Sequence, residues 1–258
     1  KKSIEMNKKL ILKLARLCSL FWLFFPTKFR KFLFTSFFII ESRGEDAKKG
    51  LKNLFLIKDK LDWVINERAL KYGSGIHPKH DLINYHKFFA TRIKDGSTIL
   101  DVGCGNGIVA LSIARELTKS YITGIDINEK NVLVANKLLK KTKLRNVDFL
   151  HGDINNQKNI KADFVILSNI LEHIEDRTKF LKNIQRISGS KTFLIRVPNF
   201  ERDWQMAMRK SLGIYYFSDI DHKIEHTVEE LKSDLASAGF KISEIITIWG
   251  EIWAKCEY

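Results

Sequence analysis

The sequence contains little cysteine and little proline, and it has no apolar run long enough to cross a bilayer. Three cysteines among 258 residues are an odd number without metal-ligand or redox spacing, so they exclude a disulfide scaffold and indicate a reducing compartment. Three prolines, without repeats or low-complexity linkers, favour an ordered chain. The apolar runs fall short of the ~18 to 20 residues of a spanning helix, and no signal-peptide cleavage site is evident.

Negative charge is scarce in the first part of the chain. The formal net charge is +14, and residues 1–60 hold 15 Lys and Arg against 5 Asp and Glu. Residues 61–258 therefore carry a formal net charge of only +4. We therefore expect a basic, aromatic, helical leader over 1–60 and one catalytic domain over 61–258.

Three glycines at alternate positions follow a short apolar strand. Residues 99–107 read ILDVGCGNG, and an apolar helical segment begins at Ile108. Glycine permits positive φ and has no Cβ to block a ligand, so the turn and the helix N-terminus make a floor for a polar ligand. The spacing is not the dinucleotide motif G-x-G-x-x-G, because Ile108 stands at its third glycine.

A carboxylate ends the second expected strand. Residues 121–126 read YITGID, and Asp126 is placed to accept hydrogen bonds from both ribose hydroxyls of a nucleoside. Its alternative role is to cap the helix expected over 129–141.

Further strands continue the same alternation with helices. Apolar, β-branched runs predict strands over 147–153, 162–169 and 193–198, and residues 240–253 read as two strands joined by a short turn. Strand-plus-helix units in this order predict an α/β fold with a doubly wound, mostly parallel sheet.

Residues 101–107 resemble motif I of the class I S-adenosylmethionine (SAM)-dependent methyltransferases, and 171–174 resemble the family's Leu-Glu-His-Ile segment after strand four. The resemblance covers about residues 70–258. It implies a Rossmann-like sheet of seven strands, SAM as cofactor, and Asp153 reading the adenine amino group, with an ordinary loop aspartate as the alternative. The cofactor-binding residues expected are Tyr72, Asp101, Gly103, Cys104, Gly105, Asn106, Gly107, Asp126, Ile127, Asp153, Ile154, Ser168 and Asn169.

A second resemblance concerns a metal. Glu172-His173 and the later His222 are similar to the Glu-x-x-Glu-His and Asp-His-Lys-x-Glu segments of small-RNA 2′-O-methyltransferases and ubiquinone-pathway O-methyltransferases. Asn169 replaces the first Glu of that pattern. The resemblance implies a divalent ion (Mg, Mn or Zn) held by Glu172, His173 and His222, which would lower the pKa of a coordinated hydroxyl.

Two alternatives to the metal remain open. In one, His173 packs beside the cofactor and His222 or His226 is the general base. In the other, these three candidate catalytic histidines only cap helices and satisfy backbone groups.

The leader combines aromatic runs with cations. Residues 21–25 and 32–40 bracket Lys28, Arg30 and Lys31, which suits helices in a membrane interface that meet anionic lipid. One alternative is a cap that walls the acceptor pocket, which is compatible with membrane contact. The other is binding to nucleic acid phosphates, which long Phe runs disfavour.

Two helices, 61–72 and 81–93, are expected between the leader and motif I. Tyr72 and His77 lie where the methyltransferase family often covers the methionine end of the cofactor. Their alternative is a packed aromatic and a turn histidine. After strand five, four side chains are candidates to grip a sugar or acidic acceptor, or else to roof its pocket: Arg196, Arg202, Trp204 and Tyr216.

We therefore expect SAM-dependent methyl transfer to an oxygen. The expected acceptor is a sugar hydroxyl of a surface glycan, or a lipid-linked or quinone-like molecule, met at the cytoplasmic face of a membrane. The alternatives are 2′-O-methylation of a small RNA or another nucleic acid, and a cofactor-binding scaffold without catalysis. Nothing in the sequence indicates an oligomeric state.

Overall fold

The computed structural model describes residues 2–44, 46–75, 77–158 and 160–258, with side chains from residue 11 onward. The chain divides into two compact units, Lys1–Glu67 and Arg68–Tyr258. We call them the helical unit and the catalytic unit. The expected boundary at residue 60 falls inside a helix that continues to Tyr72.

The helical unit consists of three helices. They are α1 (Lys2–Leu23), α2 (Thr27–Ser42) and the greater part of α3 (Ala47–Tyr72). Pro26 separates α1 from α2, because proline has no N–H to continue the helical hydrogen bonds. The segment 61–72, expected as a separate helix, is the C-terminal part of α3.

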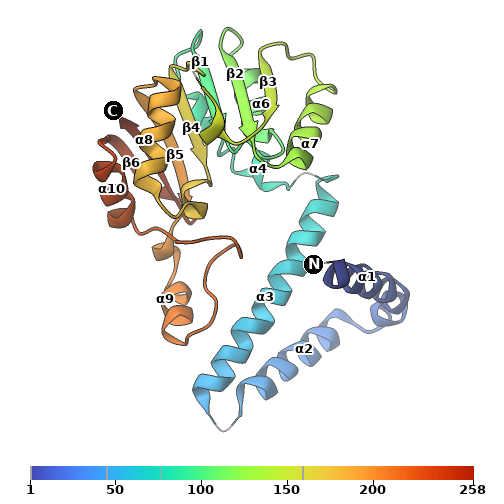
Figure 1. The fold of residues 1–258 in the computed structure, drawn as a ribbon. Coiled ribbons are helices and arrows are strands. Elements are labelled where there is room, and N and C mark those ends of the chain that lie inside the picture. Colours follow the sequence, from blue (N-terminus) through green and yellow to red (C-terminus); the bar gives the residue numbers. More distant parts are fainter. Residues whose placement is uncertain (1, 45, 76, 159) are drawn as a thin grey trace. The chain divides into compact units, whose positions relative to one another are not determined.

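The catalytic unit is built on one seven-stranded sheet with the order β3-β2-β1-β4-β5-β7-β6 (Figure 1). The first five strands are parallel, and β7 pairs antiparallel with β5 and β6. The expected doubly wound, mostly parallel α/β sheet is confirmed. The strands are β1 (Thr98–Val102), β2 (Tyr121–Asp126), β3 (Val147–His151), β4 (Phe164–Ser168), β5 (Thr192–Pro198), β6 (Lys241–Ile248) and β7 (Glu251–Glu257).

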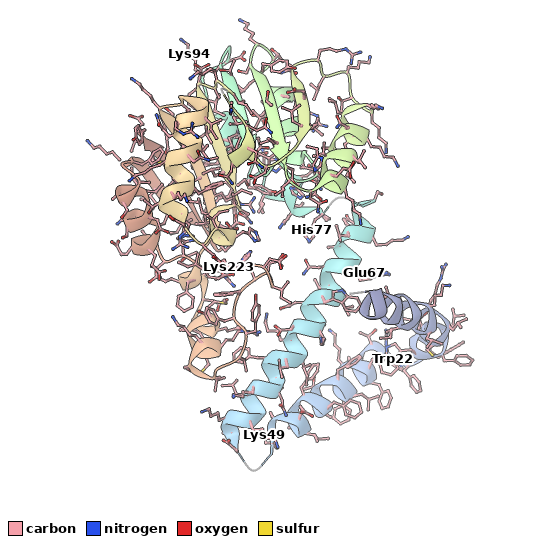
Figure 2. The ribbon with its side chains drawn as sticks, viewed as in Figure 1. Trp22, Lys49, Glu67, His77, Lys94 and Lys223 are labelled. Carbon is pink, nitrogen blue, oxygen red and sulfur yellow. The ribbon has the colours of Figure 1, made fainter. Side chains whose placement is uncertain are left out.

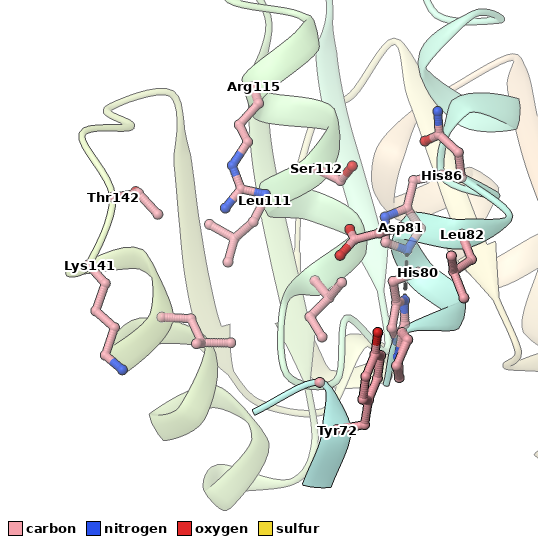
Figure 3. Close-up of a pocket in the computed structure, with 15 residues that line it drawn as sticks. Tyr72, His80, Asp81, Leu82, His86, Leu111, Ser112, Arg115, Lys141 and Thr142 are labelled. Carbon is pink, nitrogen blue, oxygen red and sulfur yellow. Dashed lines mark hydrogen bonds between the residues drawn. The ribbon is translucent and has the colours of Figure 1, made fainter. Parts of the chain in front are cut away.

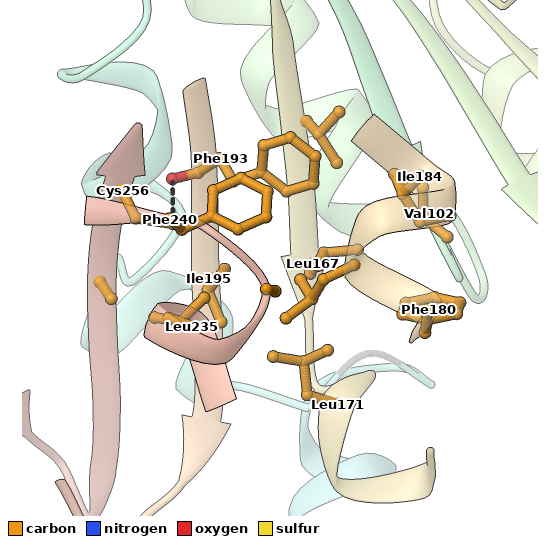
Figure 4. Packing of buried hydrophobic residues seen from close by; sticks show 14 of the residues in the cluster. Val102, Leu167, Leu171, Phe180, Ile184, Phe193, Ile195, Leu235, Phe240 and Cys256 are labelled. Carbon is orange, nitrogen blue, oxygen red and sulfur yellow. Dashed lines mark hydrogen bonds between the residues drawn. The ribbon is translucent and has the colours of Figure 1, made fainter. Parts of the chain in front are cut away.

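Helices cover both faces of the sheet. Because successive side chains of a strand point to opposite faces, each strand contributes to two cores. Val165 and Leu167 of β4 join one core with α8 and α10, whereas Ile166 joins the other core with α6 and α7. Figure 4 shows the first core, with Phe193 and Phe240 in ring contact. The covering helices are α6 (Ile108–Glu116), α7 (Glu129–Leu139), α8 (Arg177–Ser188) and α10 (Val228–Ser237).

The prediction of a single helix over 81–93 is wrong. Two four-residue helices replace it, α4 (Lys79–Leu82) and α5 (Lys87–Ala90). Asn84 lies between them with a φ of 44°, and a right-handed helix cannot continue through that conformation. Another short helix, α9 (Trp204–Ser211), follows β5.

Gly107 provides a test of the motif I turn. Its φ is 77°, and a Cβ there would stand 2.5 Å from the Phe149 ring. Gly107→Ala is expected to lower the free energy of unfolding by about 2–4 kcal/mol, the sum of left-handed strain and overpacking. The control is Gly213→Ala, which has a φ of 64° but open space around its Cβ. Equal losses for the two variants in urea denaturation would contradict the packing part of this prediction.

Candidate functional site

A cavity of about 490 Å³ opens at the carboxyl ends of β1, β2 and β4. Its volume is typical of a site for a small organic ligand. Figure 2 shows Lys223 at this edge of the sheet and Lys94 at the opposite edge. Among the residues expected to bind cofactor or catalyse, those lining the cavity are Gly103, Asp126, Ile127, Asp153, Ile154 and His173.

The glycine turn is fastened to the end of β2. The backbone N–H groups of Gly103 and Cys104 both donate to the Ile125 carbonyl, at 2.7 and 3.1 Å. A Cβ on Gly103 would overlap the Ile170 side chain, whereas a Cβ on Gly105 would meet only open space. The turn is therefore closed on its inner side and open at Gly105, where a ligand can approach the backbone.

Asp126 joins this turn to the next loop. Its Oδ2 accepts the Gly105 N–H at 2.8 Å, and its Oδ1 accepts the Asn128 N–H at 2.7 Å. Asn128, whose side chain accepts the Lys130 N–H, is the N-cap of α7, so the capping alternative for Asp126 is wrong. Oδ1 also accepts from Nδ2 of Asn131 at 3.4 Å, so Oδ2 is the oxygen that keeps a second lone pair for a ligand hydroxyl.

Asp153 begins a short 3₁₀ helix, Ile154–Asn156, and its Oδ1 accepts the Asn155 N–H at 2.9 Å. It therefore caps a turn and lines the cavity as well. Ile154 is buried beside it.

Among the expected cofactor-binding residues, two buried oxygens lack partners in the described part of the chain. They are Oδ2 of Asp101 and Oδ1 of Asn169. Burial raises the pKa of Asp101 to about 7, and the charge of Asp126 adds to the shift. Asn169 has a φ of 58° and donates its backbone N–H to the Arg196 carbonyl at 2.8 Å. Unpartnered buried acceptors fit a ligand that carries N–H or O–H donors.

The other expected cofactor residues differ in exposure. Cys104 is buried and touches the position where Gly124 would carry a Cβ; burial raises the pKa of its thiol, so only its backbone is available. Asn106 is exposed, and Ser168 accepts an N–H of Arg196 at 3.3 Å.

Tyr72 lies elsewhere. Its side chain is 85% exposed and lines a different cavity, of about 600 Å³, formed with α6, the end of α7 and residues 78–86 (Figure 3). The structure therefore does not bring Tyr72 to the cavity that contains Gly103. His77 accepts the Lys79 N–H at 3.2 Å, which matches its alternative as a turn histidine.

Glu172, His173 and His222 come together beside the first cavity. One ligand atom from each lies within 4.8 Å of the other two, and the two imidazole rings meet edge to face at 4.7 Å. The Lys223 N–H donates to the Glu172 carbonyl at 2.7 Å and joins the two segments. Residues 171–173 form a 3₁₀ helix, and Asn169 lies before it with a positive φ.

Glu172 is the unusual member of the cluster. Its side chain is fully buried, and neither carboxylate oxygen has a hydrogen-bond partner among the described residues. Burial raises its pKa to about 8, against smaller opposing effects of its own backbone N–H and then of His222. A buried carboxyl without a partner is costly, so this position points to a ligand or a function.

Glu225 orients His222. Its Oε1 accepts the Ser218 N–H at 2.5 Å, the Ser218 hydroxyl at 2.6 Å and Nδ1 of His222 at 3.1 Å, and Oε2 accepts from Arg202. Burial alone would raise the pKa of Glu225, but these hydrogen bonds, His222 first, hold it at about 2. For His222 burial acts in the other direction and lowers the pKa. Glu225 and Glu172 outweigh burial and raise the pKa of His222 above its usual value.

The sequence prediction did not place Glu225 in the site. The signal was the His-x-x-Glu spacing of His222 and Glu225, which was noted only as part of the metal pattern. Because Nδ1 of His222 is engaged, Nε2 is the ring nitrogen left for a proton or a ligand.

His226 is separate from this cluster. Its side chain is fully buried, and Nε2 lies 3.3 Å from Oδ2 of Asp234 on α10. It therefore supports the packing of α10, and its interpretation as a catalytic base is not supported by the structure.

The expected acceptor-gripping residues are mostly engaged within the protein. Arg196 is buried, and its Nε and Nη2 donate to the two carboxylate oxygens of Glu251. Arg202 donates to Glu225. Tyr216 packs on Phe200. Of the four, Trp204 is the exposed one, at the start of α9.

Comparison with known proteins identifies the fold family. Residues 93–253 match the family described as a methyltransferase domain. The chain belongs to that family. It is similar to the ribosomal protein L11 methyltransferase of Thermotoga maritima, at 31% identity over 55% of this chain and 52% of the relative. The corresponding protein of Acetivibrio thermocellus is 35% identical over 73% and 51%. The chain thus spans about half the length of these curated relatives.

Solved structures share the fold of this methyltransferase domain. A SAM-dependent methyltransferase from Aquifex aeolicus has a TM-score of 0.55 at 19% identity, covering 69% of this chain and 92% of its own. The magnesium protoporphyrin IX methyltransferase of Synechocystis, solved with bound S-adenosylhomocysteine (SAH), also gives 0.55, at 17% identity, covering 69% and 82%. The likeness shows that this chain shares its fold with these two methyltransferases.

The cavity of this methyltransferase domain fits SAM. Gly105 leaves space over the turn, Asp126 and Asp153 line the wall, and Asp101, two residues before Gly103 of the lining, has an unpartnered oxygen. Acceptors at these positions match the hydroxyl and amino donors of the nucleoside and of the amino acid part.

Asp101 makes the stability of the domain dependent on pH. Its pKa is about 7 in the folded chain and about 3.9 in an unfolded one. The folded chain therefore binds the extra proton between these values, and stability falls as the pH rises from about 4 through 7. In Asp101→Asn this loss is absent, so the variant gains stability relative to the native chain from pH 4 to pH 8.

Urea denaturation at each pH measures the Asp101 effect. Asp81→Asn, at an exposed position, serves as the control. A native-minus-variant difference that stays constant from pH 4 to pH 8 would show that Asp101 does not hold a proton in the folded chain.

Proposed function

We propose that the chain transfers a methyl group from SAM to a hydroxyl oxygen. The family and the fit of the cavity support the donor. The observation that supports an oxygen acceptor is the buried pair of Glu225 and His222, because a hydroxyl must lose a proton as it is methylated. His173 and Asp221 line the SAM cavity, so this pair adjoins the place where the donor would lie.

Bound SAM supplies a methyl group on a positively charged sulfur. The turn at Gly103–Gly107 and the acid Asp126 hold that donor in place, and alignment of this kind lowers a barrier by several kcal/mol. As the oxygen–carbon bond forms and the sulfur–carbon bond breaks, Nε2 of His222 accepts the hydroxyl proton. Glu225 keeps Nδ1 protonated and stabilises the imidazolium.

A second candidate activates the hydroxyl with a metal. The observation that favours it is Glu172, which is buried without a partner and lies within reach of two imidazoles. Carboxylate and imidazole donors suit Mg, Mn or Zn, and a bound divalent ion would supply positive charge that acidifies the acceptor oxygen. Because His222 would be a ligand, it would not be the base at the same time.

For the acceptor we propose a hydroxyl on an amphiphilic molecule at the inner face of a membrane. Candidates are a lipid-linked sugar or glycan and a quinone-like compound. Ile127 and Ile220 are 70% and 77% exposed on loops that also supply cavity-lining residues, which offers an apolar rim to such a molecule. A nucleic acid acceptor is disfavoured because residues 61–258 carry little net charge.

The general-base mechanism makes a clear kinetic prediction. His222→Gln is expected to lower the turnover of labelled SAM with membrane lipid and glycan extracts by about 10²–10⁴-fold, and Glu225→Gln by a smaller factor. SAH affinity, measured by calorimetry, stays within about threefold of native, since neither side chain lines the donor cavity.

The matched control is Glu175→Gln, on the same edge of the sheet but with a side chain that is 82% exposed. Native turnover in His222→Gln would eliminate the base. A chain that binds no SAH at all would overturn the proposed function itself, including the scaffold alternative.

Chelation separates the base from the metal. If His222 is the base, activity survives EDTA, and Glu172→Gln, an isosteric change, keeps at least about a third of native turnover. If a metal is used, EDTA abolishes turnover, one of Mg, Mn or Zn restores it, and Glu172→Gln lowers the affinity for that ion in a direct binding measurement.

A further inference from the structure

The first two helices expose their apolar side chains. Along α1, Leu14, Leu17 and Phe21 follow one another at helical spacing and are 52, 68 and 76% exposed. Phe24, directly after the helix, is 85% exposed. In α2 no residue is buried, and Phe32 and Ile40 are 65 and 68% exposed. Figure 2 shows the rings of α2 projecting from the helix near Trp22. An apolar patch of this kind marks an interaction surface.

The described side chains of the helical unit form almost no core of their own. Among its described side chains, over 11–44 and 46–67, only Gly50 and Phe55 are buried. Trp22 of α1 contacts Phe34 of α2, and Phe25 in the turn contacts Phe29 of α2, but Phe34 remains 51% exposed. Most of the stability of helices in proteins comes from packing of their apolar faces, so the exposed apolar side chains of α1 and α2 favour an apolar partner.

Charge indicates what that partner is. Residues 1–40 contain nine Lys and Arg and a single acid, Glu5. Lys13, Arg16, Lys28 and Lys31 are exposed on the same two helices as the aromatic side chains. A second copy of the chain would bring like charges together at this surface, which costs free energy. An anionic surface with an apolar interior satisfies both features.

The helices do not span a bilayer. Over the described residues, none is both long enough and apolar enough to do so. The combination of exposed Phe and Leu with flanking cations is typical of helices that lie in the plane of the interface, with rings below the headgroups and cations among them.

We propose that α1 and α2 bind the headgroup region of an anionic lipid bilayer and hold the chain at its surface. The proposal extends the proposed function by naming the place where an amphiphilic acceptor would be met, and it rests on that function only for the acceptor. Membrane binding itself is independent of methyl transfer, and its test uses no activity.

The apolar part is tested with the full chain and Phe21→Asn/Phe24→Asn. The matched control is Leu133→Asn/Val134→Asn, two exposed apolar positions of α7. Flotation with phosphatidylglycerol vesicles is expected to recover the native chain and the control, whereas the Phe variant loses at least tenfold in partition. Circular dichroism and SAH binding verify that each variant is folded.

The electrostatic part is tested with Lys28→Glu/Lys31→Glu. The control, Lys94→Glu/Lys119→Glu, changes the same net charge at exposed positions of the catalytic unit. Each Lys near an anionic surface contributes about fivefold in partition, so the α2 variant is expected to lose well over tenfold and the control little. Phosphatidylcholine vesicles, or high salt, are expected to weaken native binding likewise.

Three outcomes would overturn the membrane proposal. They are binding by the Phe variant equal to native, equal binding to neutral and anionic vesicles, and a native oligomer in sedimentation that Phe21→Asn/Phe24→Asn converts to a monomer without any vesicle binding. The last outcome would assign the surface to a second copy. Vesicle binding by a chain that transfers no methyl group would instead retain this proposal and reject the proposed function.

Discussion

The fastening of a bare backbone turn to the end of β2 is the constraint on which the site depends. The Ile125 carbonyl accepts two N–H groups of the turn, and Asp126 accepts a third from Gly105. These bonds fix the turn where the Gly103 Cα lies against Ile170 and Gly105 remains open. Without these hydrogen bonds, the glycine turn would not be held beside the acids at the strand ends.

The pair of Glu225 and His222 is held in place in a different way from the acids of the donor cavity. Asp126 is held by backbone N–H groups of the glycine turn and of its own loop, and Asp153 by one of its own loop. Glu225 instead collects donors from Ser218, Arg202 and His222. A carboxylate with so many donors is rigid and remains ionised. It therefore orients one imidazole, while Glu172 beside it has no partner at all among the described residues.

Local patterns predicted the sheet well because strand pairing and burial follow the alternation of side chains. β2 was expected over 121–126 and has those bounds. The helix expected over 81–93 was wrong because apolar periodicity did not reveal the left-handed Asn84. The contacts of His226 and Glu225 could not be predicted from their spacing in the sequence. His226 contacts Asp234, and Glu225 accepts hydrogen bonds from Arg202 and His222.

The pair of exposed Asn106 and buried Gly107 has a consequence for the ageing of the protein. An asparagine before a glycine is prone to deamidation, because the glycine nitrogen attacks the side-chain amide and forms a succinimide. Here the Gly107 N–H donates to the Cys104 carbonyl at 2.9 Å, and its φ of 77° is fixed by packing against Phe149. The folded turn thus holds the attacking nitrogen in place and slows a chemical lesion that would lengthen the backbone at the heart of the donor site.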